Sequence, residues 1–240
     1  FECTNGYENK EMIAIDGRSL QDASRFRGIG TVVRDVFQYI PNKKRYLVFF
    51  EDSNVIPETF GLQYVTFKAS KSKKKYYINL FKALQKHSVR WIHFMAQYNL
   101  PDNSSIPFSV TVHDLFNPYF LIDEKKYNQL LEPLLLKLKN AQHIIAISEY
   151  TKSEIEKYIP TKKGAVSVIH NGICLKQKAP PMDTQSDFLC KRGIHRPFIL
   201  YVGNYEFRKN MYNAMRGFLQ FYKENPEYSL VICSGRAPLF

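Results

Sequence analysis

The sequence predicts an α/β fold built on a mostly parallel sheet with helices on both faces. Short apolar runs alternate with longer segments of helical period, which is typical of strand–helix repeats. The runs are nearly continuous rather than alternating in polarity, as expected for strands buried on both faces. The strands predicted in the N-terminal part of the chain lie at 12–16, 46–50, 64–67, 91–94, 108–112, 143–147 and 166–169.

Helical segments follow several of these strands. We expect helices at 31–39, 75–86, 124–139 and 149–158. The third is expected to kink or break near Pro133, because proline lacks the amide hydrogen that a helix interior needs. Ser148 predicts the start of the fourth, since a serine side chain caps a first turn and Glu149 suits the positive end of the helix dipole.

The period of the sequence also predicts how the domains are arranged. Residues 1–10 are expected to be a non-native or disordered start, and residues 11–175 to form one domain. Residues 176–196 are rich in Lys, Gln, Pro, Asp and Ser without a sustained period, which is typical of a linker. A strand–helix–strand pattern then restarts within 197–240. One such unit is too small to bury a core of its own, so we expect this second domain to be incomplete.

A net charge of +12 is the unusual feature of the composition. It suits nucleic acid, an anionic membrane surface or phosphorylated small molecules. Nucleic acid is excluded, because the sequence has no helix-turn-helix, zinc-finger or RNA-binding motif. No apolar run approaches the roughly 18–20 residues that span a bilayer, and no secretory signal precedes the first strand. With four scattered cysteines that favour reduced thiols, these features predict a cytoplasmic protein.

Two candidate binding segments follow strands of the first domain, where open parallel sheets bind ligands. Gly28 and Gly30 lie between the first strand and the first helix, where glycines let backbone N–H groups approach an anion. A plain turn is the alternative, because the spacing is not GxGxxG. His113 follows the strand at 108–112 and is placed to hydrogen-bond a ligand, as is His93 on the preceding strand. Histidines with purely structural roles are the alternative there.

Two further candidates lie at helix starts. Ser148 and Glu149 open the helix at 149–158, where capping explains the serine and ligand binding is the alternative. Arg208 and Lys209 directly precede the last helix. Two cations beside the oriented N–H groups of a helix start can clamp a diphosphate, and solvated surface charge is the alternative.

Seven lysines crowd the segment at 68–86. In one interpretation the helix packs its apolar side chains on the sheet and the lysines are merely solvated. In the other, the lysines contact anionic lipid headgroups. The first is favoured for the helix and the second for the loop before it.

Taken in order, several segments resemble the family 4 retaining glycosyltransferases over residues 12–233. The segments are IAIDGRSL, GIG, TVHDL, HIIAISEYTKSEI, VSVIHNGI and FILYVGNYEFRKN. The resemblance implies a GT-B fold, in which an N-terminal Rossmann-like domain takes the acceptor and a second Rossmann-like domain takes the nucleotide-sugar donor. The segment 197–240 would be the first β-α-β unit of that second domain.

The resemblance also implies roles for the candidate residues. Gly28 and Gly30 would lie near the donor phosphates and the acceptor, and His113 would contact the transferred sugar. Arg208 and Lys209 would bind the diphosphate. The acceptor-side candidates are His93, Ser148 and Glu149. The reaction would need no metal and no cofactor, because the leaving diphosphate helps to deprotonate the acceptor while the cations stabilise its growing charge.

The sequence departs from the family pattern at Phe207, where proline is common, and at Cys174, where Asp often follows the preceding turn. The Glu-x7-Glu segment that holds donor sugar and ribose would lie beyond Phe240. The implied activity is transfer of a hexosyl group, such as mannosyl, to a glycan or lipid-linked acceptor in polysaccharide or lipopolysaccharide synthesis, by a protein peripheral to the inner face of the cell membrane. The alternative is a non-catalytic truncated chain that keeps acceptor or membrane binding.

Overall fold

The computed structural model describes residues 11–115, 124–159, 164–172, 179–203 and 209–234. The chain divides into two compact units, Phe1–Cys174 and Leu175–Phe240, and each is described by itself. The predicted irregular start at 1–10 lies outside the described residues.

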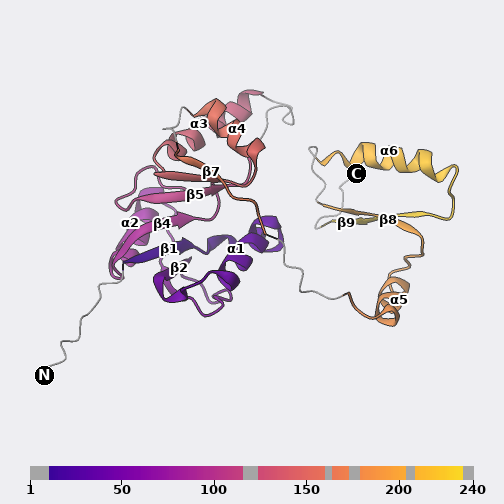
Figure 1. The fold of residues 1–240 in the computed structure, drawn as a ribbon, viewed down its shortest axis with the longest axis horizontal. Helices are drawn as coiled ribbons and strands as arrows, with labels where there is room; N and C mark the ends of the chain where they lie inside the picture. Colours follow the sequence, from indigo (N-terminus) through magenta and orange to yellow (C-terminus); the bar gives the residue numbers. More distant parts are fainter. Residues whose placement is uncertain (1–10, 116–123, 160–163, 173–178, 204–208, 235–240) are drawn as a thin grey trace, which may run out of the picture. The chain divides into compact units, whose positions relative to one another are not determined.

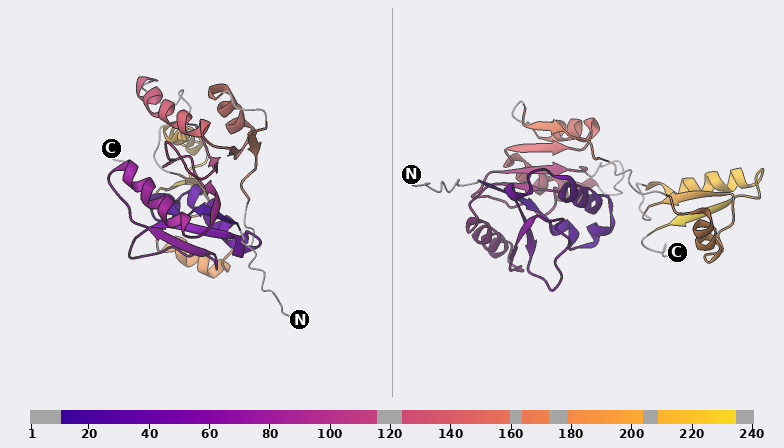
Figure 2. Two further views of the ribbon diagram at one scale, coloured as in Figure 1. Left: turned by 90° about the vertical axis from the view of Figure 1, so that its left-hand side faces the viewer. Right: turned by 60° about the horizontal axis from the view of Figure 1, so that its bottom comes forward.

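The first unit is a seven-stranded sheet in which every neighbouring pair is parallel (Figures 1 and 2). The strand order is β3-β2-β1-β4-β5-β6-β7. The strands are β1 Met12–Asp16, β2 Tyr46–Glu51, β3 Gln63–Phe67, β4 Val89–Phe94, β5 Phe108–Val112, β6 His143–Ala146 and β7 Val166–Val168. The predicted α/β class with a parallel sheet is confirmed.

Helices pack on both faces of this sheet, because successive strand residues point to opposite sides. Leu47 and Phe49 of β2 belong to the larger core, which also holds apolar residues of α2 Lys73–Gln85, α3 Glu124–Lys139 and α4 Glu149–Tyr158. Val48 and Phe50 belong to a smaller core with α1 Gly28–Tyr39. Three short 3₁₀-helices complete the described elements of the unit, namely η1 Arg18–Leu20, η2 Ala23–Phe26 and η3 Lys43–Arg45.

The expected break in α3 is not present. The helix continues through Pro133. Gln129, whose carbonyl loses its usual partner, and Pro133 are both exposed, so water can satisfy the freed carbonyl without a break.

The second unit contains α5 Met182–Cys190, followed by the parallel pair β8 Phe198–Val202 and β9 Ser229–Cys233 with α6 Met211–Tyr222 between them (Figure 1). This is the predicted β-α-β unit. Helix α5 corrects the expectation of an irregular linker at 176–196. Within the described chain it buries none of its residues, so its sequence carries no apolar period to reveal it.

Candidate functional site

The candidate site lies at the carboxyl edge of the first sheet, where the strand order reverses between β1 and β4. From β1 the chain proceeds to β2 and β3 on one side, and then crosses to β4 on the other. Open α/β sheets bind ligands at such a switch point, because the loops on its two sides diverge and leave a crevice.

A buried ion pair forms the carboxyl end of β1. The Arg18 guanidinium lies 2.7 Å from the Asp16 carboxylate, and both side chains are 6% exposed. Arg18 also donates to the Tyr76 hydroxyl at 3.0 Å and to the Asn99 carbonyl at 3.2 Å. Burial opposes its charge, but the Asp16 carboxylate and these hydrogen bonds hold the pKa of Arg18 above its usual value. Arg18 therefore ties the loop after β1 to helix α2 and to the loop after β4.

Tyr76 extends this network to the end of β2. Its hydroxyl accepts from Arg18 and donates to the Glu51 carboxylate. Burial of the ring raises the pKa of Tyr76, so the phenol stays neutral and can donate at physiological pH. This network was not predicted from the sequence. The local signal was an Asp-x-Arg pattern directly after a buried strand, but Tyr76 and Glu51 are distant in sequence.

Gly28 and Gly30 lie in the first turn of α1 rather than in a loop before it, which corrects the expected helix start at residue 31. The two glycines have different surroundings. A Cβ on Gly30 would lie 2.5 Å from the Ser24 carbonyl oxygen, so the close approach of η2 requires glycine, whereas a Cβ on Gly28 would meet open space.

Among the described residues, none accepts a hydrogen bond from the N–H groups in the first turn of α1. Its N-cap residue, Arg27, makes no side-chain capping hydrogen bond. The first intrahelical bond into Arg27 comes from Thr31, so the N–H groups of the first turn precede the helical hydrogen-bond ladder. With the positive end of the helix dipole, such donors can bind an anion.

His113 is fixed from two sides at the end of β5. Its Nε2–H donates to the Met95 carbonyl at 2.9 Å, which makes Nδ1 the acceptor of the neutral ring. Its backbone N–H donates to the side chain of Gln97 at 3.2 Å, and Gln97 donates in turn to the Asp114 carbonyl at 2.8 Å. Gln97 is 1% exposed, so it joins the carboxyl ends of β4 and β5 from inside the fold. Gln97 was not among the residues predicted from the sequence.

His93 has a different environment, inside the sheet. Its ring nitrogens lie 2.8 Å from the Ser109 hydroxyl and 3.0 Å from the Thr111 hydroxyl on β5. Burial lowers the pKa of His93 to about 4, so the ring is neutral near pH 7. With both ring nitrogens bonded to the neighbouring strand β5, the geometry favours the structural alternative for His93.

Ser148 caps α4 as predicted, because its hydroxyl accepts from the Thr151 N–H at 3.1 Å. Glu149 follows in the first turn and is exposed. The capping bond accounts for Ser148, and a role for either residue in acceptor binding stays a prediction.

Of the predicted cationic pair, Arg208 lies outside the described residues. Lys209 belongs to the second unit and is exposed. It directly precedes Asn210, which is the N-cap of α6. Within the described ranges, no cluster of three or more His, Cys, Asp or Glu side chains is placed to hold a metal ion. None of the helices in the described part of the chain is both long enough and apolar enough to cross a membrane.

Known proteins share the architecture of this chain. Residues 26–177, more than half of the chain, match Glycosyltransferase Family 4. The solved structure of Anabaena HepE with UDP and glucose has a TM-score of 0.60 at 13% identity, over 94% of this chain and 70% of that one. A glycosyltransferase from Rickettsia africae has a TM-score of 0.52 at 11% identity, over 95% of this chain and 69% of that one. A search of curated proteins finds no match.

Proposed function

The chain belongs to glycosyltransferase family 4 and has its GT-B fold, and on that premise we propose that it transfers a hexosyl group from a nucleotide-diphosphate sugar to a glycan or lipid-linked acceptor. The bond from the anomeric carbon to the diphosphate breaks and a bond to an acceptor hydroxyl oxygen forms. The hydroxyl proton passes to the leaving diphosphate. Anomeric configuration is retained, and no metal is needed.

The observation that carries this proposal is that two binding groups, the first turn of α1 and the His113 ring, lie at the carboxyl edge of the sheet. The first turn of α1 offers backbone N–H groups to the donor phosphates. His113 offers Nδ1 to a hydroxyl of the transferred sugar, with its ring fixed by Met95. In this proposal Arg208 and Lys209 stabilise the charge that grows on the leaving diphosphate.

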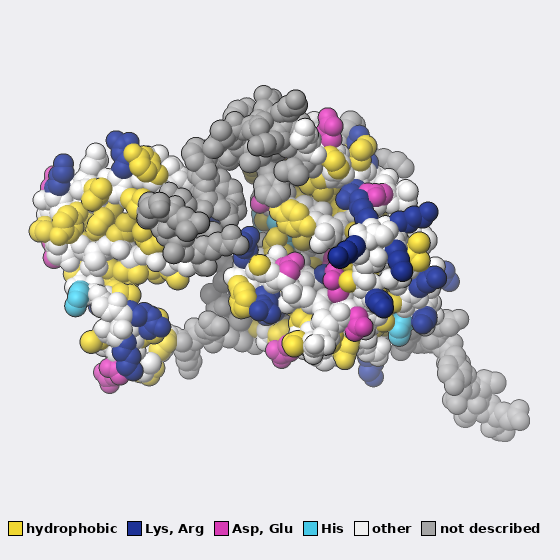
Figure 3. Space-filling view, turned by 180° about the vertical axis from the view of Figure 1, so that it is seen from behind, with side chains coloured by type: hydrophobic (Ala, Val, Ile, Leu, Met, Phe, Trp, Pro, Cys, Tyr) yellow, Lys and Arg dark blue, Asp and Glu magenta, His cyan; other side chains and the backbone are white. Residues whose placement is uncertain are grey.

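Lipid-linked acceptors would bring the protein to the inner face of the cell membrane. Lys71, Lys74 and Lys75 are exposed in the loop before α2 and in its first turn. Figure 3 shows Lys and Arg side chains gathered over part of the first unit. We include reversible attachment to an anionic membrane surface in the proposed function, and a cytoplasmic location with it.

The test is donor binding and turnover by the whole chain. Because the HepE structures hold UDP and glucose or UDP-glucose, UDP-glucose is the first donor to try, with GDP-mannose beside it. We expect release of nucleoside diphosphate, unchanged by a metal chelator, and a product that keeps the donor's anomeric configuration. Failure to bind both UDP and GDP would contradict the proposal.

Variants of the cationic pair refine this test. Arg208→Ala and Lys209→Ala each remove a charge-assisted contact of about 1.5–3 kcal/mol. Binding of the nucleoside diphosphate should weaken roughly 10- to 150-fold, measured by calorimetry. Lys191→Ala is the matched control, since it removes an exposed lysine elsewhere in the second unit. Unchanged affinity in both variants would assign the pair to surface charge.

A further inference from the structure

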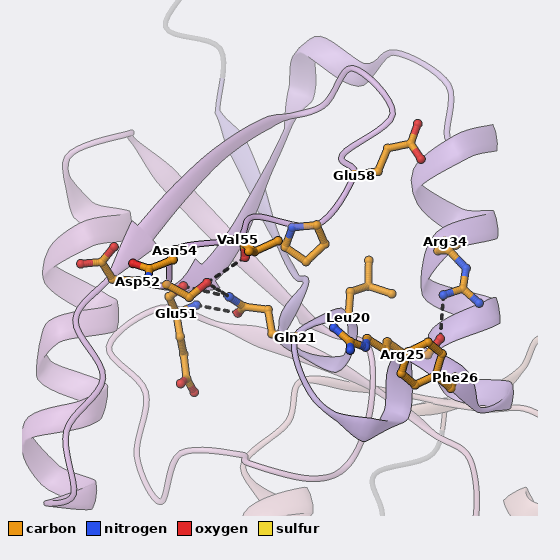
Figure 4. A pocket seen from close by; sticks show the side chains of 12 residues that line it. Leu20, Gln21, Arg25, Phe26, Arg34, Glu51, Asp52, Asn54, Val55 and Glu58 are labelled. Carbon is orange, nitrogen blue, oxygen red and sulfur yellow. Dashed lines mark hydrogen bonds between the residues drawn. The ribbon is translucent and has the colours of Figure 1, made fainter. Parts of the chain in front are cut away.

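A separate cavity of about 600 Å³ opens beside the carboxyl end of β2 (Figure 4). Its volume falls within the range of small-molecule sites, about 300–1,000 Å³. It is bordered by η1 and η2, by α1, and by the loop after β2. It shares Glu51 with the network described above, but Gly28, Gly30 and His113 do not line it.

The floor of this cavity is held rigidly. The Gln21 amide donates to the Glu51 carbonyl at 2.9 Å and accepts from the Glu51 N–H at 2.8 Å. Gln21 also donates to the Ser53 hydroxyl at 3.2 Å, and that hydroxyl donates to the Val55 carbonyl at 2.8 Å. The two sides of the cavity are therefore fixed to each other before any ligand binds, which lowers the entropic cost of binding.

The two walls differ in chemistry (Figure 4). On one side lies Phe26, which is 79% exposed, with the Arg25 guanidinium 4.5 Å from its ring centroid. On the other side lie Asp52 and Asn54. Among the described residues, neither side chain makes a hydrogen bond or an ion pair with another protein group, so both can accept hydrogen bonds from a ligand.

The charge of the lining selects among ligand classes. The carboxylates of Asp52 and Glu58 balance the guanidinium groups of Arg25 and Arg34. The Glu51 carboxylate does not add to this charge, because it accepts from the Tyr76 hydroxyl. This balance offers no excess of positive charge to phosphate or another compact anion. A sugar ring fits better, because its C–H face can pack on the negative face of an aromatic ring while its hydroxyls donate to carboxylates.

We propose that this cavity binds an uncharged sugar ring of the acceptor glycan, one unit away from the hydroxyl that receives the transferred sugar. The position at β2, one strand removed from the switch point between β1 and β4, supports an outlying subsite rather than the reacting centre. This proposal rests on the proposed function, since it assigns the ring to an acceptor.

The test uses methyl α-glycosides of glucose, galactose and mannose, titrated by NMR into the whole chain without nucleotide. We expect at least one to bind, with affinity about tenfold lower in Phe26→Ala and retained in Phe26→Trp. Phe188→Ala is a matched control, because Phe188 is also exposed and has the Arg192 guanidinium 3.6 Å from its ring centroid, but lies in α5. Its affinity should equal that of the wild type.

Three results would overturn the proposal. They are binding of none of the three glycosides by the wild type, equal binding by Phe26→Ala, and displacement of the glycoside by inorganic phosphate. UDP and GDP affinities measured on the same samples keep the two proposals apart. If the wild type binds neither UDP nor GDP, the transferase proposal is contradicted. The glycoside titrations test only the proposal for the cavity.

Discussion

At the end of β5, His113 is held from its ring by the Met95 carbonyl and from its backbone by the buried Gln97. If it contacts the sugar during transfer, His113→Ala should lower kcat by about 10²–10³, the loss typical of one preorganised donor or acceptor at a transition state. Affinity for free UDP should change little, because that ligand lacks the sugar.

The matched control is His87→Ala, which replaces an exposed histidine in the turn after α2. Its turnover should equal that of the wild type. A different pattern for His113→Ala, in which turnover and the free energy of unfolding fall together, would assign His113 a structural role.

Because His93 is buried, we expect the free energy of unfolding to depend on pH. Burial lowers its pKa from 6.5 to about 4, so the unfolded chain binds this proton more readily than the folded protein does. Its stabilising contribution is complete above pH 6.5 and is lost as the pH falls toward 4. At about 1.4 kcal/mol per pKa unit, the loss is on the order of 3 kcal/mol.

Urea unfolding at pH 7 and pH 4.5 measures this effect. The free energy of unfolding should fall less between the two values in His93→Gln than in the wild type. His87→Gln, at an exposed position, should keep the wild-type difference. Identical pH dependence in all three proteins would show that His93 does not contribute.

At the scale of single elements, the two glycines in the first turn of α1 differ in the space around them. Gly30→Ala should destabilise the protein by about 1–3 kcal/mol, because the added Cβ would lie 2.5 Å from the backbone oxygen of Ser24. Gly28→Ala should leave thermal stability unchanged or raised by about 0.5–1 kcal/mol, since its Cβ meets open space and alanine favours a helix.

The same pair tests the anion site. If donor phosphates approach this turn, the new methyl group of Gly28→Ala should weaken UDP binding in a protein that is fully folded. Unchanged affinity in that variant would place the phosphates elsewhere. Calorimetric titration and thermal unfolding of the two variants together separate binding from folding.

Elements with a strong apolar period were predictable, and elements defined by contacts were not. The strands at the core and the Ser148 cap follow from local sequence. Helix α5 buries none of its residues within the described chain, so its sequence has no apolar period from which the helix could be predicted. The start of α1 depends on η2 packing against Gly30, which is a tertiary contact.

The candidate site shows the same division. The position of His113 at the edge of the sheet was predictable, because this residue directly follows a buried strand. The residues that hold the edge together were not, because Arg18 contacts Tyr76 and Gln97 contacts Asp114 across the fold. A one-dimensional pattern records which side chains reach the edge, but not which of them are already bonded to each other there.

At the scale of the whole molecule, the net charge of +12 is distributed unevenly. Four lysines at 71–75 lie in the loop before α2 and in its first turn, and all are exposed. Lys73 forms an exposed ion pair with Asp102, in which its Nζ lies 2.7 Å from the carboxylate. Exposed pairs of this kind contribute at most about 1 kcal/mol, so the lysine remains able to face an anionic surface.

These lysines test whether the charge excess serves membrane attachment. Each lysine near an anionic surface contributes about 1 kcal/mol, screened over roughly 8–10 Å, so four can support reversible binding. We expect replacement by Gln to abolish sedimentation with phosphatidylserine vesicles while UDP affinity is kept. The quartet comprises Lys71, Lys73, Lys74 and Lys75.

The matched control replaces four exposed lysines that are scattered over the chain, which lowers the net charge equally. They are Lys44, Lys139, Lys191 and Lys223. If a local surface rather than total charge binds the membrane, the control should still sediment, and wild-type sedimentation should fade as salt rises. Wild-type protein that ignores anionic vesicles at low salt would refute membrane attachment, and equal loss in both quartets would assign the binding to net charge alone.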